Sequence, residues 1–208
     1  GLTTGTAYTF TVKATNSAGS GTASAASNSV TPAAPVTVTV PAGPKISASW
    51  HSLALDSNGT LRAWGSDALG QLGSGRTLQS PTPSPVAVTG RFSKIAAGGH
   101  NLALKTDGSL WAWGVNDVGQ LGDGTSTTRY APVRVGAGFA DIAAGTAHSL
   151  ALKTDGSLWA WGINASGQLG DGTTTDRWAP ILVGGSFAAI AAGSSHSLAL
   201  QTDGSLWA

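Results

Sequence analysis

Apolar and polar residues recur along most of the chain with a fixed period. The string HSLALKTDGSLWAWGINASGQLGDGTTTDR occupies residues 148–177, a close copy occupies 100–129 and a looser one 51–79. A fourth copy begins at His196, and the histidines at 51, 100, 148 and 196 give a spacing of 49, 48 and 48 residues. A fixed period of this size is typical of solenoids, propellers and arrays. A residue present in every copy is therefore interpreted first by what every copy needs in order to fold.

One unit, residues 132–179, contains four short segments with strand-like patterns of apolar and β-branched residues. These segments are 132–135, 139–144, 148–154 and 157–162. Asp155-Gly156 between the last two is a strong hairpin signal, because both residues tolerate turn conformations that others avoid. Four antiparallel strands in about 48 residues match one propeller blade. The pattern predicts an all-β propeller with further units at about 35–84, 85–131 and 180–208.

The length of the Asp-Gly turn decides which side chains share a face of the blade. With a two-residue loop, Leu150, Leu152, Trp159 and Trp161 lie on one face, because side chains alternate along a strand. With a three-residue loop and a bulge at Gly156, the faces reassort. Both arrangements are compatible with the sequence.

A long irregular segment, residues 163–179, follows the last predicted strand of the unit. Loops of this length are either functional or internally structured. Leu169, in the Gly-Gln-Leu-Gly string, is interpreted as a hydrophobic peg that holds the segment on the blade. The repeated Gly-Gln-Leu-Gly string is therefore expected to be internal structure, and the residues after it are expected to be exposed.

The candidate ligand-binding residues are Arg129, Tyr130, Arg177 and Trp178, which follow the Gly-Asp-Gly-Thr string in two copies. Arginine and aromatic residues are favoured at binding hot spots. Two interpretations remain open. Either these residues contact a ligand, or Tyr130 and Trp178 pack beneath the loop while the arginines are solvated.

Residues 1–32 have a different pattern. Tyr8, Phe10 and Val12 alternate with polar residues, which predicts a half-buried strand, and residues 25–30 form a second candidate strand after a turn cluster at 16–21. Two strands are marginal alone, so this part is expected to be the end of a larger β-sandwich. It resembles the last two strands of a fibronectin type III domain, a resemblance that implies a tyrosine-corner role for Tyr8. Residues 33–208 then form the repeat region.

Composition supports an all-β chain and excludes some classes of function. All ten acidic residues are Asp, and Asp favours turns whereas Glu favours helices. A net charge of +1 without a basic stripe argues against nucleic-acid binding. There is no run of eighteen apolar residues, so no membrane span is expected. The absence of cysteine excludes thiolate sites and leaves the cellular compartment open.

The string at 142–177 resembles the regulator of chromosome condensation repeat, and the resemblance covers about 170 of the 208 residues. It implies a β-propeller of seven blades, of which this chain supplies three complete repeats and part of a fourth. Remaining blades are expected downstream. A partial ring exposes unpaired blade surfaces, so the chain alone is expected to be poorly soluble or to oligomerise. The family's fold supports several functions, so its activity is not carried over from the resemblance.

Catalytic, metal-binding and cofactor-binding sites are not predicted. The four histidines occupy one position in each repeat, so a propeller places them one per blade, and each is expected to be buried with its ring bonded to nearby backbone. Asp123 and Asp171 are interpreted as turn residues rather than calcium ligands, because a calcium loop needs more oxygen ligands at alternate positions. Asp141 is interpreted as isolated, which leaves no pair of carboxylates for glycoside hydrolysis. His148 and Ser149 point to opposite faces of a strand, so they do not form a triad.

We therefore expect a non-enzymatic propeller module that binds a protein or a glycan. The fibronectin-like segment, low charge and Thr/Ser/Ala/Gly-rich composition favour a large bacterial protein that is secreted or on the cell surface. An accessory domain of an extracellular polysaccharide-degrading enzyme is the first alternative. A nucleotide-exchange-type regulator of a GTPase is the second.

Overall fold

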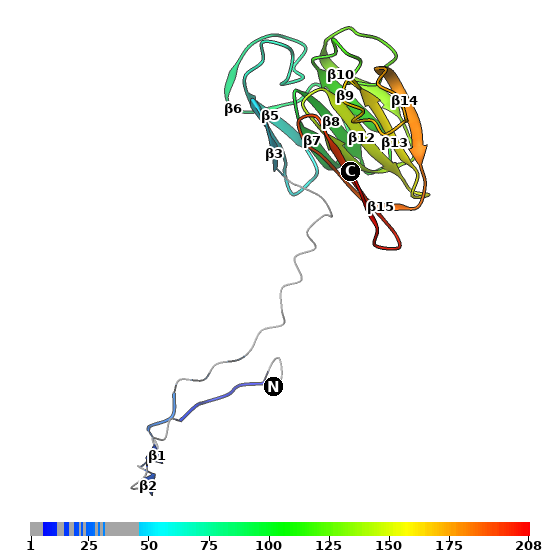
Figure 1. The fold of residues 1–208 in the computed structure, drawn as a ribbon. Coiled ribbons are helices and arrows are strands. Elements are labelled where there is room, and N and C mark those ends of the chain that lie inside the picture. Colours follow the sequence, from blue (N-terminus) through cyan, green and yellow to red (C-terminus); the bar gives the residue numbers. More distant parts are fainter. Residues whose placement is uncertain are drawn as a thin grey trace. The chain divides into compact units, whose positions relative to one another are not determined.

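The computed structural model describes residues 6–11, 15–16, 19–20, 22, 24–27, 29, 31 and 46–208. The chain comprises two compact units, Gly1–Val40 and Pro41–Ala208, and each is described by itself. The second unit carries the repeats (Figure 1).

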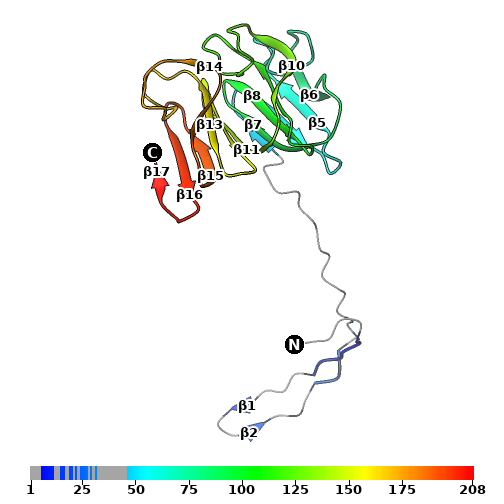
Figure 2. The same cartoon turned by 90° about the vertical axis from the view of Figure 1, so that its right-hand side faces the viewer.

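The described part of the second unit consists of four antiparallel sheets (Figure 2). The first sheet contains β3 (Ile46–Ala48), β4 (His51–Leu55), β5 (Leu61–Gly65) and β6 (Ser80–Pro85). The second contains β7 (Phe92–Ala97), β8 (His100–Lys105), β9 (Leu110–Gly114) and β10 (Arg129–Gly136). The third contains β11 (Phe139–Ala144), β12 (His148–Lys153), β13 (Leu158–Gly162) and β14 (Arg177–Gly184). The fourth contains β15 (Phe187–Ala192), β16 (Ser197–Gln201) and β17 (Leu206–Trp207).

Successive sheets stack face to face, and the first strand of each sheet lies against the first two strands of the sheet before it. β7 contacts both β3 and β11, and β11 also contacts β15. The last strands of the sheets, β6, β10 and β14, lie at the opposite edges. This arrangement confirms the all-β, blade-like architecture expected from the repeat.

The predicted grouping of strands within residues 132–179 is wrong. Residues 132–135 lie in β10, which pairs with β9 of the preceding sheet, whereas the third sheet runs from Phe139 to Gly184. The long loop returns the chain alongside the strand it has just left, so the strand after the loop closes the same sheet. A periodic sequence shows that four strands recur, but it does not show at which strand a blade begins.

The hairpin between β12 and β13 has a three-residue loop, which decides between the two arrangements that the sequence left open. The Lys153 N–H donates to Ser157 O at 2.9 Å, and the Gly156 N–H donates to Lys153 O at 3.0 Å. Gly156 has a φ of 80°, which a glycine adopts without strain. Both tryptophans of β13 consequently oppose Ser149 and Ala151. The leucines of β12 lie on the other face.

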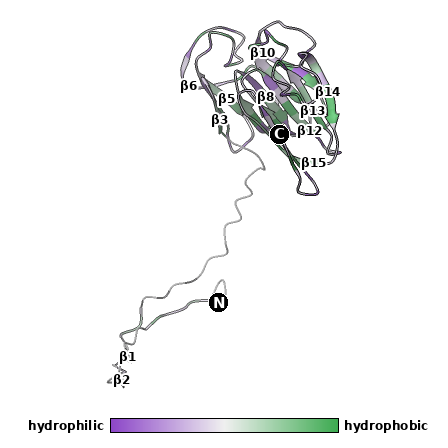
Figure 3. Cartoon of the chain, in the orientation of Figure 1, coloured by the Kyte–Doolittle hydropathy of each residue, from purple (hydrophilic) through white to green (hydrophobic). Residues whose placement is uncertain are grey.

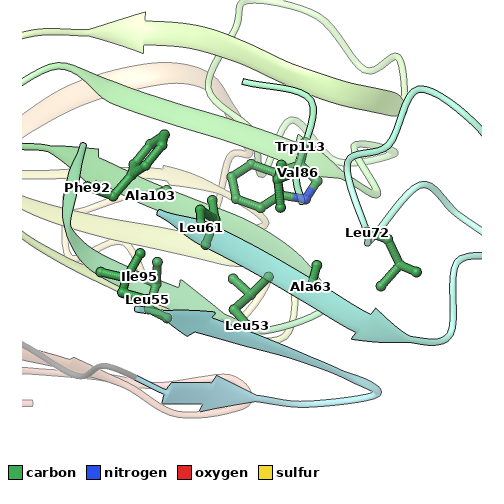
Figure 4. Packing of buried hydrophobic residues seen from close by; sticks show 10 residues of the cluster. All are labelled: Leu53, Leu55, Leu61, Ala63, Leu72, Val86, Phe92, Ile95, Ala103 and Trp113. Carbon is green, nitrogen blue, oxygen red and sulfur yellow. The ribbon is translucent and has the colours of Figure 1, made fainter. Parts of the chain in front are cut away.

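The core lies between the sheets, where a leucine face packs against a face of tryptophan and alanine. Between the second and third sheets, Leu102, Leu110 and Leu121 enclose Trp161 and Ala151, and all five are fully buried. Figure 4 shows the equivalent packing one sheet earlier, with Trp113 beside Leu61 and Val86. Figure 3 shows the corresponding concentration of apolar residues in the stacked strands.

The first unit contains a short hairpin, formed by β1 (Thr15–Asn16) and β2 (Gly19–Ser20), which overlaps the turn cluster predicted at 16–21. The Ser27 N–H donates to Phe10 O at 2.8 Å, which connects the two predicted strand regions. Phe10 is exposed, so the expected burial is not found at this position. The described residues of this unit form a two-stranded sheet and no β-sandwich. The predicted junction between the two parts and the predicted start of the repeats, both within 32–40, lie outside the described residues. The described residues contain no helix that is long and apolar enough to cross a membrane.

Candidate functional site

The long loops of the second and third sheets are each organised around one buried asparagine. In the third sheet, Asn164 Oδ1 accepts the Leu169 N–H at 3.0 Å, and its Nδ2 donates to Asp171 Oδ1 at 3.0 Å and Thr173 O at 3.0 Å. Asn116 makes the same contacts in the second sheet. Leu169 is buried, which confirms its predicted role as a peg. The buried amide stabilises the loop, because it satisfies several polar groups at once.

The arginines predicted as ligand-binding residues are paired within their own loops. Arg177 Nε and Nη2 donate to Asp171 Oδ2 at 2.8 and 2.6 Å, and Arg129 Nε donates to Asp123 Oδ2 at 2.7 Å. Burial raises the pKa of Asp171, but hydrogen bonds from Thr173 and Arg177 outweigh this effect and bring its pKa to about 2. The aspartates are thus turn residues, as predicted, and they also neutralise the neighbouring guanidinium groups.

The two aromatic residues form part of the contact between sheets and are also partly open to solvent. Tyr130 lies against Gly70 of the preceding loop, where a Cβ would come within 2.7 Å of its Cδ1, and Trp178 lies against Gly119 in the same way. Their backbone carbonyls accept N–H groups from Gly75 at 2.8 Å and from Gly124 at 2.9 Å. The side chains are nevertheless 42% and 51% exposed. We call Tyr130 and Trp178, at the starts of β10 and β14, the aromatic rim.

The aromatic rim and the arginines do not form one surface patch. Residues 129 and 130 are consecutive in β10, as are 177 and 178 in β14, so their side chains point to opposite sides of the strand. The arginine turns toward its own loop, and the aromatic ring turns toward the loop of the preceding sheet. The interpretation that Tyr130 and Trp178 pack beneath the loop therefore holds for one side of each ring, and the other side is open to solvent. The arginines, which that interpretation expected to be solvated, form ion pairs with Asp123 and Asp171.

The histidines at positions 51, 100 and 148 each join one sheet to the next, whereas His196 is exposed, so the expectation of burial is wrong for that copy. His100 Nε2 lies 2.6 Å from Ser149 Oγ, His148 Nε2 lies 3.0 Å from Ser197 Oγ, and His51 contacts Asn101 in the same manner. These partners are side chains of the neighbouring sheet, so the prediction of bonds to nearby backbone is wrong. The sequence signal for this contact was a polar residue directly after the histidine of the next copy: Asn101, Ser149 or Ser197. As expected, His148 and Ser149 face opposite ways.

Burial keeps the linking histidines neutral. It lowers the pKa of His100 to about 3 and that of His148 to about 4. The Nδ1 atoms of these rings, and of His51, have no hydrogen-bond partner among the described residues. Within residues 46–208 these histidines do not come together with other potential ligands as a metal-binding group.

Further contacts between sheets were not predicted. The indole N–H groups of Trp113 and Trp161 donate to the carbonyl oxygens of Gln71 and Gln120, each at 2.9 Å. The glutamine of the recurring Gly-Gln-Leu-Gly string, 42 and 41 residues before these tryptophans, was the sequence signal. Lys94 of β7 also pairs with Asp141 of β11 at 2.7 Å. This partner of Asp141 is a cation and not a second carboxylate. The loops and strands of this unit thus form a chain of sheet-to-sheet contacts.

Three stretches match the model of the regulator of chromosome condensation (RCC1) repeat: residues 58–104, 107–152 and 155–200. A second RCC1 repeat model matches 92–120 and 139–168. The first set spans more than half of the chain. The chain belongs to the RCC1 repeat family. Among curated proteins, none matches the chain in sequence. The fibronectin type III resemblance of residues 1–32 gains no support from these comparisons.

Two solved structures of a yeast RCC1 protein are similar to the described fold. Prp20p of Saccharomyces cerevisiae, studied for its binding to Gsp1p and histones, has a TM-score of 0.68 and 24% identity over 74% of this chain. Yeast RCC1 (Prp20) bound to Kap60 has a TM-score of 0.68 and 28% identity over 77% of this chain. In both cases the match covers 42% of the solved chain, so the present chain spans less than half the length of these relatives.

Proposed function

We propose that this chain is part of a non-enzymatic RCC1-type propeller that binds a neutral glycan along the aromatic rim, Tyr130 and Trp178. The observation that carries the proposal is the repeated placement of a half-exposed aromatic ring at the start of two successive outer strands. One side of each ring packs against a glycine of the preceding loop, Gly70 for Tyr130 and Gly119 for Trp178. A rigid ring with an open side offers apolar contact area at little cost in conformational entropy.

The charge around the rim favours a neutral ligand. Arg129 and Arg177, the cations nearest in sequence, are held by Asp123 and Asp171. An acidic ligand would have to compete with these partly buried ion pairs. A polysaccharide chain, with its apolar ring faces and neutral hydroxyl groups, matches two aromatic platforms among threonine-rich loops.

The proposed setting is a large bacterial protein that is secreted or displayed on the cell surface, with further blades that complete the propeller. The fibronectin-like pattern of residues 1–32 and the low charge of the chain support this setting. A protein ligand is the alternative, because Prp20p, a relative by fold, binds Gsp1p and histones. An accessory role beside a polysaccharide-degrading domain is compatible with the same rim.

The proposal predicts that removing either aromatic ring weakens glycan binding by about tenfold, which corresponds to about 1.4 kcal/mol. The variants Tyr130→Ala and Trp178→Ala are compared with the parent chain by affinity electrophoresis in gels that contain a neutral β-glucan, xylan, chitin derivative or starch. Leu182→Ala is the matched control, because Leu182 is a comparably exposed apolar residue on the same strand as Trp178.

Retardation of the parent by at least one polysaccharide, lost in the two aromatic variants and kept in the control, supports the proposal. Equal retardation of all four proteins, or none by any polysaccharide, contradicts glycan binding at the rim. Near-ultraviolet circular dichroism identifies a variant that has lost its packing rather than its binding surface.

A further inference from the structure

The long loop of the first sheet, residues 66–79, joins β5 to β6 (Figure 1). Residues 74–79, with the sequence Ser-Gly-Arg-Thr-Leu-Gln, are all exposed. The aligned segments of the other two loops, 123–128 and 171–176, each begin and end with a partly buried residue. Even the apolar side chain of Leu78 is 65% exposed. The first loop therefore differs from its counterparts in how firmly this segment is held.

The first cause of this difference is Asp67, which stands where the other loops have their central asparagine. Asn116 Nδ2 donates to the carbonyl oxygens of Thr125 and Thr127 at 3.0 and 3.1 Å, and these bonds hold the second loop in place. The carboxylate of Asp67 accepts the Leu72 N–H at 2.9 Å but has no N–H group to donate. Its Oδ2 is buried and has no hydrogen-bond partner among the described residues. The two aligned carbonyl groups of the first loop therefore lack this donor.

The second cause is the loss of an ion pair across the loop. In the third sheet, Arg177 binds Asp171 at 2.6 Å. The aligned positions of the first loop are Ser80 and Ser74, which cannot form this pair. The contacts of Ser74 are longer, because the Arg76 N–H donates to its Oγ at 3.3 Å and this Oγ lies 3.5 Å from Arg76 O. A segment with little burial and weak hydrogen bonds opens locally at a low cost in free energy.

Arg76 is the arginine that this segment exposes. The chain has six arginines, at positions 62, 76, 91, 129, 134 and 177, and those at 62, 129, 134 and 177 lie within strands. Arg91 is exposed, but its carbonyl oxygen accepts the Thr106 N–H at 3.0 Å and the following residue, Phe92, is buried. Arg76 has exposed neighbours on both sides, and its guanidinium makes no ion pair with any described residue. Exposed loops of small and polar residues are preferred sites of proteolytic nicking.

We propose that the peptide bond between Arg76 and Thr77 is a processing site for a trypsin-like endoprotease. The specificity pocket of such an enzyme carries an aspartate, which binds an unpaired guanidinium. One water molecule is consumed in the cleavage. The bond between the Arg76 carbonyl carbon and the Thr77 nitrogen breaks, the carbon gains the water oxygen and becomes a carboxylate, and the nitrogen takes up the protons as a new α-amino group.

The two products are expected to stay together after cleavage. The core between the first and second sheets takes Leu53 and Leu61 from one product and Phe92 and Trp113 from the other (Figure 4). β6, which follows the cut, remains paired with β5, which precedes it. Cleavage therefore frees two chain ends in the loop and leaves the stacked sheets in place.

The first test uses the 208-residue chain and an arginine-specific endoprotease under native conditions, with the products identified by mass spectrometry. The first products are expected to end at Arg76 and to begin at Thr77. They are expected to elute together in size-exclusion chromatography and to separate in urea. A first cut after any other arginine, or an uncut chain, overturns the proposal. Separation of the products without urea contradicts the expected association.

The second test distinguishes a poorly held loop from an arginine that is merely exposed. Thr174→Arg places an arginine at an exposed position of the third loop, and the bond after position 174 is expected to be cut at least about tenfold more slowly than the bond after Arg76. The combined variant Asp67→Asn, Ser74→Asp and Ser80→Arg gives the first loop the polar groups of the third and keeps Arg76.

This combined variant is also expected to be cut after Arg76 at least about tenfold more slowly than the parent, because cleavage follows the population of the open loop. Cleavage after position 174 at the rate of the parent bond overturns the proposal, and so does an unchanged rate in the combined variant. Near-ultraviolet circular dichroism checks that the combined variant keeps its packing, and the Thr174→Arg comparison decides the matter if it does not. None of these outcomes depends on glycan binding at the aromatic rim.

Discussion

Each histidine that links two sheets carries its proton on Nε2, and the hydrogen bonds of its partner show why. The hydroxyl of Ser149 donates to Gln120 O at 2.8 Å, so its oxygen is left to accept a hydrogen bond from His100. Asn101 likewise donates through Nδ2 to Gln71 O and accepts from His51 through Oδ1. The ring is thus a neutral donor in the contact between sheets. A second proton on the buried Nδ1 would have no acceptor among the described residues.

Acid is therefore expected to destabilise the stacked sheets through His100. The pKa of His100 is about 3 in the folded chain, and its ordinary value of 6.5 applies to the unfolded chain. Well above pH 6.5 the ring is therefore neutral in both the folded and the unfolded chain. Between pH 6.5 and about 3 the unfolded chain takes up the proton first, and the free energy of unfolding falls as the pH falls, by at most about 1.4 kcal/mol per pH unit for this group. Urea unfolding at pH 7, 6 and 5 measures the slope. His100→Gln is expected to reduce it, and an unchanged slope in that variant contradicts the assignment.

The long loops of the three sheets keep the same structure although the polar side chains that stabilise them differ. The second and third loops use a buried asparagine, an aspartate and an arginine, as in Asn164, Asp171 and Arg177. The aligned positions of the first loop are Asp67, Ser74 and Ser80. The first loop has its carboxylate at position 67, which aligns with Asn164, and a serine where the third loop has Asp171. Neither loop therefore places two carboxylates in contact. Asp67 Oδ1 still accepts the Leu72 N–H at 2.9 Å, and burial raises the pKa of this acid.

This exchange predicts strong coupling between positions 164 and 171. Asn164→Asp alone is expected to cost about 3 kcal/mol or more, because it places a second buried carboxylate where Nδ2 lies 3.0 Å from Asp171 Oδ1. Asp171→Ser added to that variant is expected to recover about 1–3 kcal/mol, although it releases Arg177. A double-mutant cycle by chemical denaturation measures the coupling. Strictly additive effects would show that the two loop designs are not alternatives.

The whole repeat unit is stabilised by sheet-to-sheet contacts, so burial depends on having a neighbour on each face. β8 and β12 lie between two sheets, and all their residues except the final lysines are buried. In β16 only Ala199 is buried. The ion pair between Lys94 and Asp141 adds to the contact between inner strands, but both side chains are partly exposed, so its contribution is expected to be below about 1 kcal/mol.

Local stability is therefore expected to decline toward the fourth sheet. Amide hydrogens of β12 are expected to exchange only through opening of the stacked sheets, whereas those of β16 and β17 exchange through local opening that costs less free energy. Hydrogen–deuterium exchange followed by mass spectrometry resolves these segments. Protection of β16 equal to that of β12 would contradict the dependence on a second neighbour.

The sequence alone determined the features that depend on local patterns. The period, the four strands in each repeat, the Asp-Gly hairpin and the buried Leu169 were all predictable, because alternation, turn residues and apolar pegs act over a few residues. Only the tertiary structure decided which strand belongs to which sheet, because a periodic pattern has no marked beginning. It also decided the faces of β12 and β13, which reverse with one residue of loop length. The partners of His100, Tyr130 and Trp161 come from a neighbouring sheet tens of residues away in the sequence, so stacking had to bring them together before their roles became visible.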